Sequence, residues 1–400
     1  MDKSSLRIIK QTNDYAAGNY DPLRIVILGG QGAWAHSSDY WHYLDCLACY
    51  SALNFGYGHP RLVQAAISQL KKVCVTSRAV YTENLGQFCE AVSGLCGFGG
   101  KVLPMNTGAE GVETAIKIAR KWGYKVKKVK PNEANIVFCT NNFHGRTITI
   151  ISGSTEEQYR DGFGPFTPGI RFVPFGNANA LSRAVDENTV GFLVEPIQGE
   201  GGVNVPHNGY LKDIEQICER EGILMIVDEV QTGFGRTGCD LAYQHDDVIP
   251  DIVVLGKALG GGILPVSAVV ARKSVMNVIK PGDHGSTFGG NPLACAVGIE
   301  AVKLLKEERL SERSKKLGSY LLAELKEIKS PAIRDIRGRG LMIGIEMRNK
   351  NDADSIQWEL LKRQVLVGKT RNVIRINPPL VILESELDVL VHELKIALTP

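Results

Sequence analysis

Two apolar runs in the middle of the chain each lead to a single charged residue. The run Ile223–Val227 is followed directly by Asp228, and Ile252–Leu255 leads through one glycine to Lys257. Near-continuous apolar runs of this length are typical of strands in a parallel sheet that is covered on both faces. Because functional groups gather where the carboxyl ends of such strands meet, we expect Asp228 and Lys257 to lie close together.

The same strand-like texture recurs along the chain. Further apolar runs occupy Ile136–Cys139, Phe192–Val194 and Val266–Val270. Between them lie helical periods such as Tyr210–Arg220, whose apolar residues form one stripe and which Gly222 can terminate. This alternation of strand and helix predicts a doubly wound α/β domain with a mostly parallel sheet.

The pattern changes after about residue 290, which predicts a second, smaller unit. We expect a large α/β domain over residues 46–290 and an α+β lobe over residues 291–400. Residues 1–45, rich in Gly, Tyr and Asp, are expected to form an extended arm that joins this lobe. The lobe is predicted to contain long helices, short strands and a final helix, at Pro292–Lys329, Leu341–Glu346, Val373–Asn377 and Glu384–Leu398.

Composition argues against several classes of function. The net charge of +3 is small, and the most basic stretch, Lys125–Lys130, lacks the interleaved aromatics of a nucleic-acid site. No apolar run is long enough for a membrane helix, and the first residues lack an export-signal pattern, so we expect a cytoplasmic protein. The nine cysteines, an odd number, are not a disulfide framework, and we interpret Cys46 and Cys49 as core thiols. No histidine spacing predicts a metal site.

The pair Lys257 and Asp228 suits one cofactor chemistry. A lysine at a strand end can form an imine with an aldehyde cofactor, and a neighbouring carboxylate can keep a pyridinium nitrogen protonated. Each residue alone would be interpreted as a solvated strand cap, but together they predict pyridoxal phosphate. A nucleotide-binding α/β protein is the main alternative from another class. It is disfavoured because the chain has neither G-x-x-x-x-G-K-[ST] nor a G-x-G-x-x-G that opens a first βαβ unit.

Two further motifs have a functional and a structural interpretation each. Thr107 and Glu110 have the spacing of a capping box before the helical pattern Gly111–Trp122. This helix start is either a phosphate site or simply a well-capped helix. Phe143, after a strand, could stack on a flat heterocycle or close the core, and Arg146 could bind a carboxylate or be a surface residue.

Read together, the motifs of the chain resemble the subgroup of fold-type-I pyridoxal-phosphate aminotransferases, class III, that act on ω-amino groups. The resemblance spans essentially the whole chain. It implies the fold-type-I α/β architecture, with a large, mostly parallel-sheet domain and a smaller α+β lobe formed by both chain ends. The motifs that carry it are Met105–Glu110, Asn142–Thr147, Val194–Glu200, Val227–Gly233, Leu255–Gly260 and His284–Pro292.

The resemblance assigns roles around the cofactor. It implies that Lys257 forms the imine, that Asp228 holds the ring nitrogen and that Gln231 donates a hydrogen bond to the phenolic oxygen. By the same resemblance Phe143 stacks on the ring. The remaining cofactor contacts are the phosphate amides of Gly108 and Ala109 and, from the neighbouring subunit of a homodimer, Thr287. Gly111 departs from the family pattern and is expected to loosen the helix without disturbing the phosphate amides.

The resemblance also implies the substrates, which are ornithine and 2-oxoglutarate. Tyr20 and Tyr50 are similar to a tyrosine pair that contacts ornithine, and without the resemblance they would be interpreted as rim tyrosines. Arg375 resembles the family's α-carboxylate arginine, Glu200 the glutamate that pairs with it, and Arg146 the residue that holds the distant carboxylate. N-acetylornithine and 4-aminobutyrate remain alternative donors. Asn377, two residues after this arginine, departs from the family pattern without an interpretation.

Overall fold

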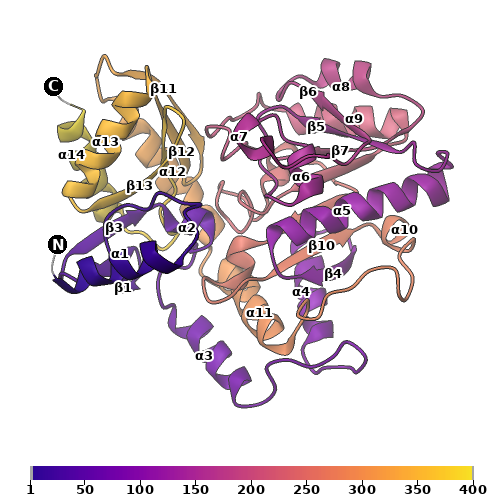
Figure 1. The fold of residues 1–400 in the computed structure, drawn as a ribbon, viewed down its shortest axis with the longest axis horizontal. Coiled ribbons are helices and arrows are strands. Elements are labelled where there is room, and N and C mark those ends of the chain that lie inside the picture. The colour runs from indigo at the N-terminus through magenta and orange to yellow at the C-terminus, as the bar shows by residue number, and fades with distance from the viewer. Residues whose placement is uncertain (1–2, 399–400) are drawn as a thin grey trace.

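A computed structural model describes residues 3–398, which form two units, each built around a seven-stranded sheet (Figure 1). In the larger unit the strand order is β4-β10-β9-β8-β7-β5-β6. The strands from β6 to β9 run parallel, whereas β10 is antiparallel to β9 and to β4. The strands are β4 (Lys101–Met105), β5 (Asn135–Cys139), β6 (Ile170–Val173), β7 (Thr189–Val194), β8 (Leu224–Asp228), β9 (Ile252–Leu255) and β10 (Ser267–Ala271).

Helices cover both faces of this sheet because its strands are buried on both sides. Along β5, Ile136 and Phe138 belong to the core that contains the apolar residues of α5, whereas Val137 and Cys139 belong to the core that contains those of α9. Such two-sided burial is the reason that the central strands read as continuous apolar runs. The helices of this unit are α3 (Pro60–Leu70), α4 (Leu85–Cys96), α5 (Gly108–Trp122), α6 (Ile148–Ser152), α7 (Glu157–Arg160), α8 (Ala178–Ala184), α9 (Tyr210–Glu221), α10 (Lys273–Met276) and α11 (Pro292–Glu307).

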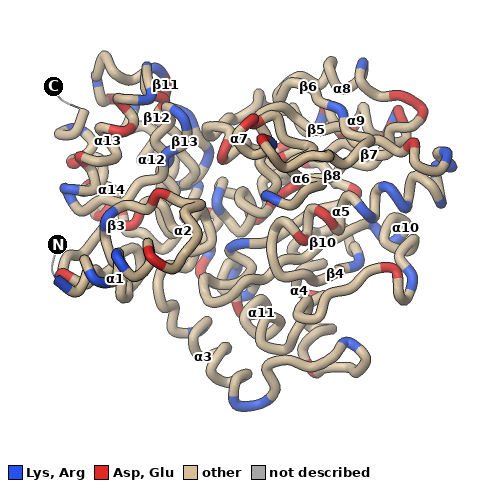
Figure 2. The backbone as a smooth tube through the Cα atoms, in the orientation of Figure 1, with Lys and Arg blue, Asp and Glu red and all other residues tan. Residues whose placement is uncertain are grey.

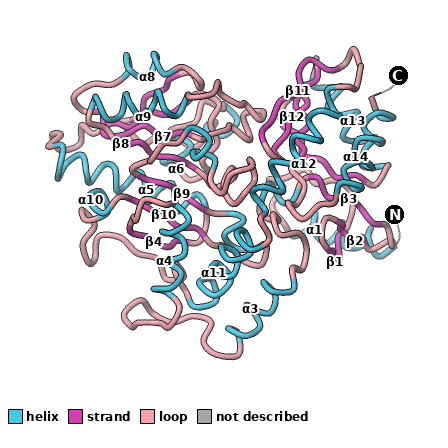
Figure 3. The backbone as a smooth tube through the Cα atoms, turned by 180° about the vertical axis from the view of Figure 1, so that it is seen from behind, coloured by secondary structure: helices cyan, strands magenta, loops and turns pink. Residues whose placement is uncertain are grey.

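The smaller unit combines both ends of the chain in one sheet of order β1-β2-β3-β13-β14-β12-β11. The two ends meet where β3 runs parallel to β13, with Leu44 opposite Val365. Figure 3 shows this unit beside the larger one, with the first helix α1 and the last helix α14 both in it. Its elements are α1 (Lys3–Tyr15), β1 (Ile27–Gln31), β2 (Trp34–Ser37), β3 (His42–Cys46), α2 (Ala48–Ser51), α12 (Leu310–Lys326), β11 (Ile333–Arg339), β12 (Met342–Met347), α13 (Lys350–Lys362), β13 (Val365–Thr370), β14 (Val373–Ile376) and α14 (Glu384–Ala397).

The predicted fold class is confirmed, and the predicted strands are present with small shifts at their ends. The N-terminal segment differs from the expectation, because it is not a purely extended arm. It contains α1 and three strands of the smaller sheet. The helix α11 contacts α3, α4 and the turn at Lys257. We therefore propose a division of the chain near residues 45 and 308 rather than near residue 290.

Surface and thiol chemistry agree only in part with the sequence interpretation. Lys and Arg are dispersed among Asp and Glu over both units (Figure 2). Within residues 3–398, no helix is long and apolar enough to span a membrane. All nine cysteines, which lie within the described residues, are free thiols. Cys46 is buried, but the interpretation of Cys49 as a core thiol was wrong: its side chain is exposed because the backbone turns left-handed at this position.

Close backbone packing in the smaller unit gives a first testable prediction. Gly318, within α12, faces the turn between β11 and β12, and a Cβ there would lie 2.1 Å from the carbonyl oxygen of Gly340. Gly318→Ala is therefore expected to destabilise the protein by about 1–3 kcal/mol through overpacking, measured by denaturant unfolding. Ser319→Ala, at the exposed neighbouring position, is the control and should change stability by less than about 0.5 kcal/mol. Equal effects of the two substitutions would contradict the predicted clash.

Candidate active site

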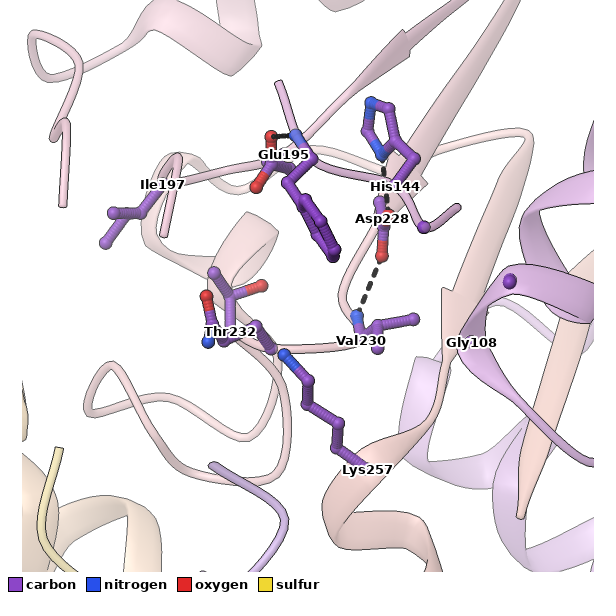
Figure 4. Close-up of a pocket in the computed structure, with 12 residues that line it drawn as sticks. Gly108, His144, Glu195, Ile197, Asp228, Val230, Thr232 and Lys257 are labelled. Carbon is purple, nitrogen blue, oxygen red and sulfur yellow. Dashed lines mark hydrogen bonds and ion pairs between the residues drawn. The ribbon is translucent and has the colours of Figure 1, made fainter. Parts of the chain in front are cut away.

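The carboxyl ends of β8 and β9 open into a cavity of about 190 Å³. Asp228 is the last residue of β8, and Lys257 follows β9 after one glycine. In the close-up view Lys257 extends into the cavity from one side, and Asp228 reaches it from the other (Figure 4). The cavity is lined by Gly108, Ala109, Phe143, His144, Gly145, Glu195, Ile197, Asp228, Val230, Gln231, Thr232 and Lys257.

Lys257 is half-buried, lines the cavity and has a constrained backbone. Its φ is 45°, a left-handed value that is costly for a lysine and is tolerated where the surrounding structure enforces it. Burial lowers the pKa of its amine to about 8, although the charges of Glu200 and Asp228 act in the opposite direction. At neutral pH about a tenth of this amine is therefore unprotonated, far more than for an ordinary lysine. Such a group can act as a nucleophile or as a general base.

Asp228 is held by two neighbours. Its Oδ1 accepts the backbone N–H of Val230 at 3.0 Å, and its Oδ2 lies 2.7 Å from Nδ1 of the buried His144. Burial opposes a charge on His144, but the hydrogen bond and the charge of Asp228 raise the pKa of this imidazole above its usual value. The nearby Glu195 is also buried, and burial raises the pKa of its carboxyl to about 7. Asp228 therefore presents an oriented carboxylate in a poorly solvated setting.

The first turn of α5 forms another side of the cavity. The side chain of Thr107 accepts the N–H of Glu110, and the carboxylate of Glu110 accepts the N–H of Thr107, so the predicted capping box is present. The next amides, those of Gly108 and Ala109, are among the helix N–H groups that have no partner within a helix. A Cβ at Gly108 would lie 2.9 Å from Cγ1 of Val230. The backbone at this helix start is therefore packed closely and carries the partial positive charge that favours an anion.

Gly111 has a packing role. A Cβ at this position would lie 2.8 Å from Cγ1 of Val254 in β9. The glycine therefore lets α5 approach the strand that leads to Lys257. The expected loosening of the helix at Gly111 stays a prediction.

On the outer side of the cavity an exposed arginine lies against two aromatic rings. The guanidinium carbon of Arg146 lies 3.5 Å from the ring centroid of Tyr159 and 5.5 Å from that of Phe143. No carboxylate among residues 3–398 forms an ion pair with Arg146. Cation–π contact holds a guanidinium without occupying its N–H groups. Arg146 is therefore available to bind a carboxylate from solution.

A second arginine, Arg375 in β14, is almost fully buried and is already paired. Its Nη1 donates to Oε1 of Glu200. The ring of Tyr50 lies over the same guanidinium at 5.4 Å, and the carbonyl of Tyr50 accepts a hydrogen bond of 3.2 Å from Nε2 of Gln231. These contacts join the smaller sheet to the cavity. Arg375 can bind an incoming carboxylate only where Glu200 moves away.

The remaining predicted residues lie further from the cavity. Tyr20 is exposed, and its phenol is close enough to contribute to the raised pKa of Tyr50, which burial chiefly causes. Thr287 is exposed on the loop after α10 and does not line the cavity of its own chain. Motif analysis did not assign Glu195 or Tyr159. Glu195 lies within a quoted motif, but no sequence signal distinguishes Tyr159 from a surface residue.

Comparisons with known proteins agree with this geometry. The model of the aminotransferase class-III family matches residues 15–398. The chain is 49% identical over 390 residues to the ornithine aminotransferase of Brevibacillus brevis, with 97% of each chain covered. A solved ornithine aminotransferase of Toxoplasma gondii has a TM-score of 0.97 at 42% identity, covering 99% of this chain and 95% of that chain. A solved acetylornithine aminotransferase of Elizabethkingia anophelis has a TM-score of 0.91 at 44% identity, covering 99% of both.

The lowered pKa of Lys257 predicts an unusual pH dependence of its reactivity. In the cofactor-free folded protein, acylation of this amine should rise with a midpoint near pH 8, because the free amine is the nucleophile and the protonated form is unreactive. The rate at each pH is measured by mass spectrometry of the Lys257 peptide. The same peptide in unfolded protein is the control and should show a midpoint near about 10.4. Coinciding midpoints would contradict the effect of burial.

Proposed function

Because this chain belongs to the class-III aminotransferase family, we infer that it transfers the δ-amino group of L-ornithine to 2-oxoglutarate. The products are glutamate 5-semialdehyde and glutamate. The relative from Brevibacillus brevis that carries the name ornithine aminotransferase supports this activity over nearly the full length of the chain.

The arrangement of the two arginines carries the proposal. Ornithine must react through its terminal amine, although its α-amino group lies beside a carboxylate that a free arginine near Lys257 would capture. Glu200 neutralises Arg375, the arginine on the cavity side, and so disfavours α-carboxylate binding there. Arg146, which has aromatic rather than carboxylate partners, can hold the distant carboxylate of ornithine instead. Bidentate arginine–carboxylate geometry gives such a contact its selectivity.

In the second half of the reaction 2-oxoglutarate must react at the carbon next to a carboxylate. We infer that Glu200 then swings away from Arg375. The freed guanidinium takes the carboxylate beside the keto group, and Arg146 takes the other one. One site can thus accept both partners, because the movement of one carboxylate changes the charge that the substrate meets.

Pyridoxal phosphate is the cofactor of this family, and the residues around the cavity fit it. They provide a buried amine, an oriented carboxylate, an aromatic ring and a helix start with free amides. When bound, the cofactor supplies a conjugated ring that accepts the electron pair released when a proton leaves the carbon that bears the donor nitrogen. The residues that would hold it are Lys257 at the aldehyde, Asp228 at the ring nitrogen, Gln231 at the phenolic oxygen, Phe143 on the ring face, and Gly108 and Ala109 at the phosphate.

The protein side chains divide the proton chemistry between them. Lys257, with its pKa near 8, can accept a proton at Nζ and return it at a neighbouring carbon. The carboxylate of Asp228 is held in place by Nδ1 of His144 and by the N–H of Val230. Burial of the cavity keeps bulk water away from these groups and strengthens their electrostatic effect.

N-acetylornithine is the second candidate donor, and it is favoured by the likeness to the acetylornithine aminotransferase of Elizabethkingia anophelis. We propose that two tyrosines favour ornithine. The ring of Tyr50 lies over Arg375, and the exposed Tyr20 contributes to the raised pKa of Tyr50, which burial chiefly causes. Both hydroxyl groups would then contact the donor.

We also propose that the chain works as a cytoplasmic homodimer with shared active sites. Thr287 lies outside the cavity of its own chain on an exposed loop, beside the exposed Phe288. A second copy of the chain could place this hydroxyl at the phosphate end of the cavity. The free cysteines are compatible with a reducing compartment.

The donor assignment predicts the order of half-reaction rates. Each donor alone should change the absorbance of the cofactor in the holoenzyme as the first half-reaction proceeds. The ratio of rate constant to dissociation constant should be at least tenfold higher for ornithine than for N-acetylornithine or 4-aminobutyrate. This ratio corresponds to about 1.4 kcal/mol of transition-state discrimination. Stopped-flow spectra with each donor alone provide the measurement. A faster reaction with N-acetylornithine would replace ornithine by the second candidate.

The pairing of Glu200 with Arg375 predicts a shift in selectivity. Glu200→Ala frees the arginine, so the kcat/KM of glutamate as donor should rise relative to that of ornithine by about tenfold or more, or about 1.4 kcal/mol. Glu200→Gln keeps a polar side chain but removes the charge, and it should shift selectivity in the same direction. An unchanged ratio in both variants would show that Glu200 does not mask Arg375.

A further inference from the structure

Residues 48–51 form one turn of left-handed helix beside the cavity, labelled α2 in Figure 1. The φ angles are 45° at Ala48, 46° at Cys49, 57° at Tyr50 and 75° at Ser51, and ψ is 48° and 40° at the two central residues. In an L residue this conformation brings Cβ close to the next carbonyl oxygen, so it normally occurs at single positions. Four successive non-glycine residues in it make the turn strained.

One buried carboxylate holds the start of this turn. Oδ1 of Asp45 accepts the backbone N–H groups of Leu47 and Ala48, both at 2.8 Å. Oδ2 of the same side chain accepts the hydroxyl of Tyr57 at 2.7 Å. Asp45 is 3% exposed, so these charge-assisted hydrogen bonds are shielded from water. The carboxylate therefore determines the direction in which the chain leaves β3.

The strain is not offset by burial of the residues at the centre of the turn. The side chain of Cys49 is exposed, and Tyr50 is 40% exposed. The hydroxyl of Ser51 is buried, yet it has no hydrogen-bond partner among residues 3–398. Packing of the buried Ala48 and Ser51 anchors only the two ends of the turn. Strained segments that the surrounding structure enforces cluster at functional sites.

The turn orients both ends of Tyr50 toward the substrate side of the cavity. The carbonyl of Tyr50 accepts from Nε2 of Gln231, which lines the cavity, while its ring lies over the guanidinium of Arg375. In a right-handed or an extended backbone the carbonyl and the side chain of one residue would point in other directions relative to each other. A relaxed turn would lose one of these contacts or both.

We propose that Asp45 is a positioning residue for the amino donor, because it holds the left-handed turn 48–51 and that turn places Tyr50 in the donor site. This inference rests on the proposed function, since it concerns how the donor is bound. The side chain of Asp45 hydrogen-bonds to Leu47, Ala48 and Tyr57, none of which is among the residues that line the cavity. Its effect on the reaction therefore passes through the backbone.

Steady-state kinetics of the holoenzyme give the first test. In Asp45→Ala the KM for ornithine should rise at least tenfold while kcat changes less than threefold, because Lys257 and Asp228 lie on other elements. The control is Asp39→Ala, which removes a carboxylate of the same N-terminal segment that accepts from Ser37 and should leave both constants within twofold. The proposal is overturned if the KM of Asp45→Ala rises no more than that of the control. It is also overturned if kcat of Asp45→Ala falls by as large a factor as its KM rises.

A rescue experiment separates positioning from general stability. Glycine adopts the left-handed conformation at no steric cost. Cys49→Gly added to Asp45→Ala should therefore restore the KM at least threefold toward the wild-type value. A KM equal to or above that of Asp45→Ala would show that the carboxylate does not act by holding a strained turn.

Melting temperatures test the strain without any substrate, and they apply even where Asp45→Ala does not fold. Cys49→Gly alone should raise the melting temperature, whereas Cys74→Gly, at a half-buried position without a positive φ, should lower it. A fall in both variants overturns the strained turn and the proposal with it. If the wild-type enzyme shows no turnover with ornithine while Cys49→Gly still raises the melting temperature, the result counts against the proposed function instead.

Discussion

One buried guanidinium connects segments of the two units. Arg236 is fully buried, and its Nη1 donates to the carbonyls of Leu341 and Pro378 while its Nη2 donates to Oδ1 of Asn54. Burial lowers the pKa of this side chain to about 9, so it remains charged at neutral pH. The hydrogen bonds to these three acceptors offset part of the cost of burying the charge, although Nε of Arg236 has no hydrogen-bond partner among residues 3–398. The acceptors of Arg236 belong to three separate segments of the chain. These segments must therefore keep fixed positions relative to one another.

The candidate active site needs this fixed junction because its groups come from both units. Asp228 and Lys257 lie at the carboxyl ends of β8 and β9 in the larger unit. Tyr50 belongs to the segment after β3, and Arg375 belongs to the smaller sheet. Reaction at a terminal amine demands a set distance between the amine anchor and the carboxylate anchors. A misplacement of about 1 Å can reduce a rate by about a hundredfold. The junction at Arg236, the ion pair of Arg375 and the left-handed turn beside it all contribute to a fixed distance between these anchors.

Much of the larger unit could be predicted from periodicity. Strands such as β7 and β9 are buried on both faces and therefore read as apolar runs, and α9 shows its stripe and its terminating Gly222. The edge strands β6 and β11 were not predicted, because their partly exposed residues follow no clear apolar pattern. The left-handed turn was also missed, since Ala48, Cys49 and Tyr50 carry no local preference for that conformation.

The sequence by itself determined which chemistry the chain can support. A carboxylate and a lysine that each follow a buried strand, and a capped helix start, can be read from local sequence patterns. Only the tertiary structure decided how these groups are tuned. The hydrogen bond of His144 to Asp228, the stacking of Tyr159 on Arg146 and the bond of Asp45 to the turn join residues that are distant in sequence or belong to no motif. Burial and orientation arise when the chain packs, so the spacing of residues in the sequence does not encode them.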